Sequence, residues 1–127
     1  MTLRWYAALL VWAVWFTGCT TGNDIHLTGK SGEVFRRLTG AGAITPSEKV
    51  TIYGTEEPPS AQLQCHEAQH KAQAAVIADA LVAIGAIDDD DISRMWAWLT
   101  VYAGEHLQRG YSGSRFELGA RKACEGQ

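Results

Sequence analysis

The chain has 127 residues, 46% hydrophobic and 20% charged, so it suits one globular domain and is neither disordered nor collagen-like. The formal net charge is −3, and no basic run is longer than Arg36-Arg37. This argues against nucleic acid as a partner, because its binding usually needs a clustered basic surface.

The first feature along the chain is an apolar run, residues 5–16 (WYAALLVWAVWF), which follows a single basic residue, Arg4. The run is too short to cross a bilayer as a helix, which takes roughly 20 apolar residues. It has the length of the apolar region of a signal peptide. We therefore expect residues 1–18 to be a signal peptide and the folded part to lie outside the cytoplasm. The alternative is an uncleaved signal anchor, which gives the folded part the same location.

The residues directly after this run, Thr17-Gly18-Cys19, resemble the lipobox of bacterial lipoproteins, although Phe16 stands where an aliphatic residue is usual. The resemblance implies a lipid anchor on Cys19 that holds the protein in the membrane, facing the periplasm or the exterior. In the signal-anchor alternative, Cys19 is free or buried. Residues 19–32 are rich in Thr, Gly, Asn and Lys, so we interpret them as a flexible tether before a domain of residues 33–127.

The spacing of apolar residues predicts one strand and several helices in this domain. The expected strand is residues 49–53 (KVTIY), which alternate β-forming residues. The expected helices are residues 31–38, 60–84, 91–108 and 114–123. The fold class is therefore mainly α with a small β element. On the helix of residues 91–108, the apolar stripe predicts that Trp96 is buried and that Trp98 is partly exposed.

The helix of residues 60–84 carries the motif His66-Glu67-Ala68-Gln69-His70, the HExxH arrangement of zinc-dependent peptidases. Residues four apart lie on one face of a helix, so His66 and His70 can bind one tetrahedral zinc ion. Glu67 lies beside that face, where it can take a proton from a water molecule that zinc makes more acidic. The motif predicts a zinc site with Glu67 as general base. The alternative is a surface helix that carries two histidines by chance.

A catalytic zinc site needs a third protein ligand and one open position. No His lies within residues 71–81, so the third ligand is expected later in the chain, at Glu105, His106 or Glu117. Glu117 has a competing interpretation, because Ser114 and Glu117 have the spacing of a helix capping box. His106 falls on the apolar stripe of its helix, which favours a core residue or a donor near the zinc ion.

The segment GYSGSRFELGAR, residues 110–121, resembles the segments that follow HExxH in small bacterial zincin-like metallopeptidases of the Glu-zincin type. The resemblance extends over residues 49–123, although Gly113-Ser114 stands where an Asn is more typical. It implies a minimal zincin-like domain: a motif helix, a second helix and a C-terminal ligand helix beside one or a few edge strands. It also implies that Glu117 is the third zinc ligand.

The chain has three cysteines, Cys19, Cys65 and Cys124. If Cys19 takes a lipid, Cys65 and Cys124 remain as an even pair, which is expected to form a disulfide in an oxidising compartment. That bond would join the motif helix to the last helix. The alternative makes Cys65 a metal ligand, but adjacent helix residues point about 100° apart, which disfavours a metal shared with His66 and His70.

Two functions from different classes follow from these features. The first is an exported, lipid-anchored zinc metallopeptidase that hydrolyses peptide bonds in peptides or cell-envelope proteins. In it, Tyr111 or Tyr102 is a candidate to stabilise the oxyanion of the reacting carbonyl. The second is a non-catalytic cell-envelope lipoprotein that uses a zincin-like fold as a binding or structural module.

Overall fold

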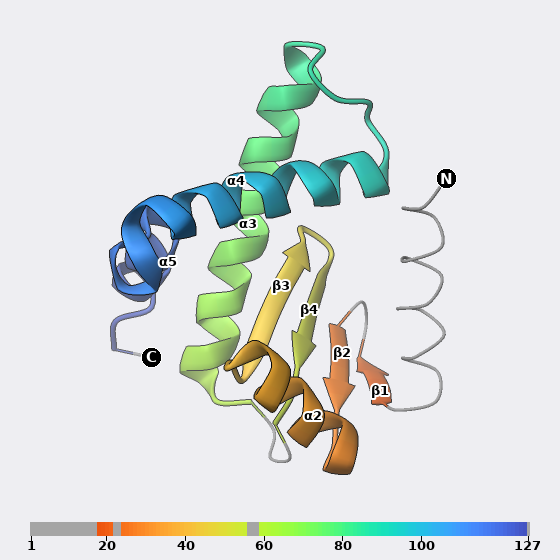
Figure 1. Cartoon of the computed structure of the whole chain (residues 1–127), viewed down its shortest axis with the longest axis vertical. Coiled ribbons are helices and arrows are strands. Elements are labelled where there is room, and N and C mark those ends of the chain that lie inside the picture. Colours follow the sequence, from red (N-terminus) through yellow and green to blue (C-terminus); the bar gives the residue numbers. More distant parts are fainter. Residues whose placement is uncertain (1–17, 22–23, 56–58, 127) are drawn as a thin grey trace.

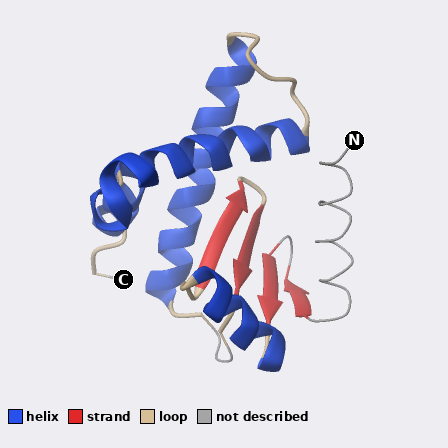
Figure 2. Cartoon of the chain, viewed as in Figure 1, coloured by secondary structure: helices blue, strands red, loops and turns tan. Residues whose placement is uncertain are grey.

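The structure is a computed structural model that describes residues 18–21, 24–55 and 59–126. Over these residues the chain forms four helices and one sheet of four strands (Figure 1, Figure 2). The elements in chain order are β1 (Gly18–Thr21), β2 (Asp24–Leu27), α2 (Gly29–Thr39), β3 (Ala43–Ser47), β4 (Val50–Tyr53), α3 (Ala61–Ala83), α4 (Asp91–Gly113) and α5 (Arg115–Ala123). The predicted class, mainly α with a small β element, is confirmed. Residues 1–17, which hold most of the expected signal peptide, lie outside the described part.

The sheet is mixed and has the strand order β1-β2-β4-β3. β2 runs parallel to β4, whereas β1 pairs with β2, and β3 with β4, in antiparallel fashion. β3 is therefore an edge strand, and it is the strand that α3 and α4 both contact (Figure 1). This contact places the edge of the sheet against the helix that carries the HExxH motif.

The ordered fold begins earlier than the sequence suggested. The expected strand is present as β4, but most of β1, all of β2 and the start of α2 fall within residues 19–32, which we expected to be a flexible tether. Cys19 lies in β1, opposite His26 of β2. Asp24 holds β2 in place, because its Oδ1 accepts hydrogen bonds from the backbone N–H of Thr51 (3.0 Å) and from Lys71 Nζ (2.5 Å). Polar residues thus join β2 to both β4 and α3, and a search for apolar runs does not detect such a strand.

The motif helix α3 has clear signals at both ends. Ser60 caps its start, because Ser60 Oγ accepts a hydrogen bond from the backbone N–H of Leu63 (3.1 Å). The helix stops before Gly85, whose φ of 75° lies in the left-handed region that favours glycine. Between these ends, Ala74 and Ala78 are fully buried, and their small side chains allow neighbouring elements to approach closely. The predicted limits, residues 60–84, are confirmed to within one residue at each end.

The two tryptophans of α4 exchange the positions that we predicted for them. Trp98 is 1% exposed and Trp96 is 39% exposed, so the prediction of a buried Trp96 is wrong. Trp98 faces the sheet, where its indole N–H donates to the backbone carbonyl of Thr45 (2.9 Å). Tyr102, one turn later, packs against the Trp98 ring at 5.2 Å between ring centroids. The inward face of α4 therefore carries amphipathic side chains, which a count of purely apolar residues does not detect.

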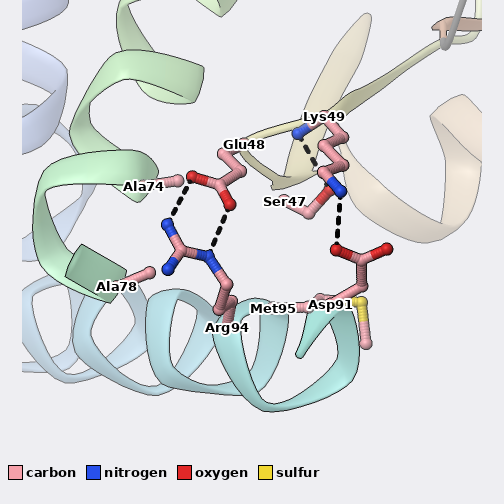
Figure 3. Close-up of a pocket in the computed structure, with 8 residues that line it drawn as sticks. All are labelled: Ser47, Glu48, Lys49, Ala74, Ala78, Asp91, Arg94 and Met95. Carbon is pink, nitrogen blue, oxygen red and sulfur yellow. Dashed lines mark hydrogen bonds and ion pairs between the residues drawn. The ribbon is translucent and has the colours of Figure 1, made fainter. Parts of the chain in front are cut away.

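An ion-pair network fixes the β3–β4 turn to the helices (Figure 3). Arg94 of α4 binds Glu48 of the turn through two hydrogen bonds, of 2.6 and 3.0 Å. The same guanidinium pairs with Asp79 of α3 at 2.5 Å. Nearby, Lys49 Nζ lies 2.7 Å from Asp91 Oδ1 at the start of α4. The network joins the turn to both helices, so β3 is anchored beside the motif helix.

Candidate metal centre

The two histidines of the motif direct their Nε2 atoms toward the same point. His66 Nε2 and His70 Nε2 lie 3.2 Å apart on α3. His70 is buried, and its Nδ1 lies 2.8 Å from Gln73 Oε1. Because an amide oxygen only accepts, Nδ1 carries the hydrogen of that bond, and Nε2 of the neutral ring keeps its lone pair for a metal. Gln73 is held in turn by α5, since its Nε2 donates to the carbonyl of Phe116 (3.0 Å).

Glu117 of α5 completes this cluster from the other side. Its Oε2 lies 2.8 Å from His66 Nε2, and its Oε1 lies 3.1 Å from His70 Nε2. The side chain is 2% exposed, and Tyr102 donates its hydroxyl hydrogen to Oε1. Tyr102, which we considered for an oxyanion, therefore orients Glu117. The structure brings together the three residues that sequence reasoning selected as ligands.

The capping-box interpretation of Glu117 is wrong. Ser114 occupies the N-cap of α5, but it makes no side-chain cap hydrogen bond, and the Glu117 carboxylate faces the histidines. Glu105 takes the capping part instead, because its Oε1 accepts from the backbone N–H of Arg115 (3.0 Å). The same oxygen pairs with Arg109 (3.0 Å), so Glu105 belongs to a surface ion cluster at the α4–α5 junction. The Glu117 carboxylate therefore caps no backbone group of α5 and is available to the histidines.

The spacing of the facing atoms fits a tetrahedral zinc ion. Ligand atoms at zinc–nitrogen and zinc–oxygen bond lengths of about 2.0–2.1 Å lie roughly 3.3 Å from one another in a tetrahedron. The nearest nitrogen–nitrogen and nitrogen–oxygen pairs of His66, His70 and Glu117 are 2.8 to 3.2 Å apart. Two imidazoles and one carboxylate are also the donor set of many catalytic zinc sites. The cluster can therefore accept such an ion with small outward shifts of the side chains.

Glu67 lies next to this cluster and is held by the sheet. His66, Glu67 and His70 form a group whose possible ligand atoms all lie within 4.8 Å of one another. Glu67 is buried, and its Oε2 accepts a hydrogen bond from Thr45 Oγ1 of β3 (2.6 Å). This is the geometry that an HExxH motif requires: two histidines on one face and a carboxylate beside them.

The electrostatics of the cluster favour a bound cation. Burial alone would raise the pKa of Glu117, but hydrogen bonds from His70 and Tyr102 outweigh it and lower the pKa to about 2. Burial opposes charge on His70 as well, yet its bonds to Glu117 and Gln73 raise its pKa. Burial and then Glu117 raise the pKa of Tyr102, which keeps its hydroxyl protonated and able to donate. The site therefore holds a buried carboxylate whose charged form is favoured by its partners, a charge that suits a cation.

These shifts predict how the metal-free protein responds to acid. A carboxyl whose pKa drops on folding adds stability above its unfolded pKa and loses it as the pH falls through the folded pKa. Between the ordinary value of 4.5 and about 2, Glu117 should lose a contribution on the order of 3 kcal/mol. His70 acts in the opposite sense, because a raised pKa gives stability that is lost as the pH rises. Urea unfolding across this range should show a shallower acid limb for Glu117→Gln than for wild type. Equal slopes would assign the loss to other carboxyls.

Cys65 and Cys124 form a disulfide, as predicted, with their Cα atoms 5.8 Å apart. The bond excludes Cys65 as a metal ligand. It connects the residue directly before His66 to the C-cap of α5, the helix that carries Glu117. Structural disulfides persist in oxidising compartments, which agrees with a location outside the cytoplasm.

A groove of about 1030 Å³ opens beside the cluster, lined by β3, α3, α4 and α5. Tyr111 lines it and is 56% exposed. Burial and then Glu117 raise the pKa of the Tyr111 hydroxyl. His106 lies between the rings of Tyr102 and Tyr111, at centroid distances of 5.4 and 5.3 Å. Its Nδ1 is buried and makes no hydrogen bond within the described residues, so His106 is only partly the satisfied core residue that we expected.

Two residues of this site, Gln73 and Thr45, were not predicted from the sequence. Gln73 follows His70 by three positions, a spacing that puts both on one helix face and could have identified it. Thr45 lies in β3, a strand that the sequence did not predict, so nothing suggested that it would face Glu67. Both residues orient groups that the motif already names.

A comparison of the chain with models of known families, with curated proteins and with solved structures finds no match. The geometry alone therefore defines the class of site: a buried His/Glu/His group that can hold a metal ion in an HExxH arrangement. In the part of the chain that the structure describes, no helix combines the length and the apolar character needed to span a bilayer.

Proposed function

We propose that the protein is an exported zinc-dependent metallopeptidase. His66, His70 and Glu117 would hold the zinc ion, and Glu67 would act as general base. The observation that carries the proposal is the Glu117 carboxylate, which comes from a separate helix and faces both histidine Nε2 atoms at 2.8 and 3.1 Å. A chance pair of surface histidines has no reason to be met by a buried, oriented carboxylate.

The reaction needs a polarised carbonyl, an activated water and a proton carrier. When bound, zinc supplies Lewis acidity, which polarises the carbonyl and makes water more acidic. Glu67 accepts the proton of the attacking water and later delivers it to the leaving amine, which balances the hydrolysis of one peptide bond. Tyr111, at the groove, is the residue that we assign to the developing oxyanion.

The groove suits an extended peptide. β3 is an edge strand and lines the groove over most of its length, so a substrate strand can pair with its unused backbone groups. The Thr45 carbonyl is already taken by Trp98, so that pairing would use other positions on the strand. We propose peptides or cell-envelope proteins as substrates, reached through a lipid anchor on Cys19 that holds the domain at the membrane.

The test is the zinc content of the purified full chain, measured together with hydrolysis of a quenched fluorescent peptide library. We expect one zinc ion per chain, loss of hydrolysis on chelation, recovery on adding zinc, and a lower melting temperature for the metal-free protein. Absence of zinc after reconstitution would contradict the proposal. One zinc ion per chain without hydrolysis would instead support the non-catalytic binding module.

A further inference from the structure

Two buried threonines connect the sheet to the motif. Thr51 of β4 is fully buried and Thr45 of β3 is nearly so, although a hydroxyl costs free energy to bury without a partner. Their Oγ1 atoms lie 2.9 Å apart, and Thr45 Oγ1 lies 2.6 Å from Glu67 Oε2. The three side chains thus form one continuous hydrogen-bonded chain from β4 through β3 to α3.

The direction of this chain follows from the donors available. An ionised carboxylate only accepts hydrogen bonds, so Thr45 must give its single hydroxyl hydrogen to Glu67. Thr45 can then only accept from Thr51, which donates. Thr51 is fixed in its strand by the bond from its backbone N–H to Asp24 Oδ1 (3.0 Å). All three members are buried, so water does not compete for these bonds.

We propose that Thr45, supported by Thr51, is the positioning residue for Glu67. Thr45 ties Oε2 of the carboxylate to the sheet, which leaves Oε1 to face the groove and keeps Glu67 from turning to join the metal ligands. This inference rests on the proposed function for its catalytic consequence, but the hydrogen bond itself can be tested without catalysis. The Thr45 hydroxyl acts on the reaction through Glu67, to whose carboxylate it is bonded.

The first measurement is a double-mutant cycle on the metal-free full chain, with Thr45→Val and Glu67→Ala as the single variants. Valine has the shape of threonine without the hydroxyl, so Thr45→Val removes the bonds to both Glu67 and Thr51 while the side-chain shape is kept. The loss of the Thr51 bond occurs in the single and the double variant alike, so it cancels in the cycle. If the two side chains are coupled, the double variant loses less stability than the sum of the single losses. Additive losses would overturn the proposal, whether or not the protein is a peptidase.

The second measurement is turnover by the zinc-loaded chain. Thr45→Val should lower kcat roughly 10- to 100-fold with KM and zinc content unchanged, and Thr45→Ser, which keeps the hydroxyl, should restore most of it. Thr100→Val, on the far side of α4, is the matched control and should leave kcat at the wild-type value. Unchanged turnover in Thr45→Val, or no rescue by serine, would overturn the positioning role. Coupling in the cycle beside an inactive wild type would leave the positioning role standing and reject the proposed peptidase.

Discussion

Glu67→Gln is expected to keep its zinc ion and to lose peptide hydrolysis by roughly 10²- to 10⁴-fold in kcat. Glutamine has nearly the same size, and its amide oxygen can still accept the hydrogen bond that Thr45 donates at 2.6 Å. The amide cannot take a proton from water at neutral pH, so the substitution removes the general base with little structural change. The measurement pairs elemental analysis for zinc with steady-state kinetics on a peptide substrate.

A matched control for this substitution is Glu105→Gln, which changes a carboxylate of the same kind in the ion cluster at the α4–α5 junction. It should leave turnover at the wild-type rate. Retained hydrolysis in Glu67→Gln would reject Glu67 as the base. A loss of zinc in that variant would mean that Glu67 is itself a ligand, in place of a group beside the metal.

Glu117→Ala is expected to lower zinc affinity by at least about a hundredfold, and with it all hydrolysis. Two histidines on one helix are then the remaining ligands, and two ligands are too few for a protein zinc site. The substitution also leaves the Tyr102 hydroxyl without its acceptor, so some stability is lost as well. The affinity is measured by competition with a chromophoric chelator, and helix content is followed by circular dichroism.

Glu117→Gln separates these two effects, because it keeps an acceptor for Tyr102 and removes the charge that zinc requires. It should lower zinc affinity in the same direction, and at neutral pH it should lose only the stability that the ionised carboxylate contributes, on the order of 3 kcal/mol. Full zinc binding by Glu117→Ala in a folded protein would exclude Glu117 as a ligand. The paired histidines would then need a different third partner from the groove, and His106 would be the first to test.

The parts of the fold that the sequence predicts are those governed by local signals. The motif helix is bounded by Ser60 at its cap and by Gly85 after its end, and both ends agree with expectation. The strands were harder, because β2 is held by the polar Asp24 and β3 contains a proline in its pairing region. β2 alternates polar and apolar residues over only four positions, and β3 does not alternate.

The residues of the site that are close in sequence could be predicted, and most of those that are distant in sequence could not. His66 and His70 are four residues apart, and a helix alone brings them together. Glu117 lies 51 positions from His66, and only the resemblance in its surrounding segment selected it from the three candidates. Thr45 and Tyr102 reach the site through the packing of β3 and α4, which single-sequence patterns do not encode. The exposures of Trp96 and Trp98 were predicted the wrong way round for the same reason. The inward face of α4 carries Trp98 and Tyr102, whose polar atoms bond to Thr45 and Glu117.

The disulfide implies that α5 becomes covalently linked to α3 only after the chain meets an oxidising environment. A newly made chain in a reducing cytoplasm keeps both thiols, so α5 is joined to α3 only by non-covalent contacts, of which the Gln73–Phe116 bond is one. In the exported protein that we propose, oxidation would join Cys65 to Cys124 and fix Glu117, the proposed third ligand, beside the two histidines. For the proposed peptidase, this order would separate synthesis from activity, because the covalent link between the two ligand helices would form only outside the cytoplasm.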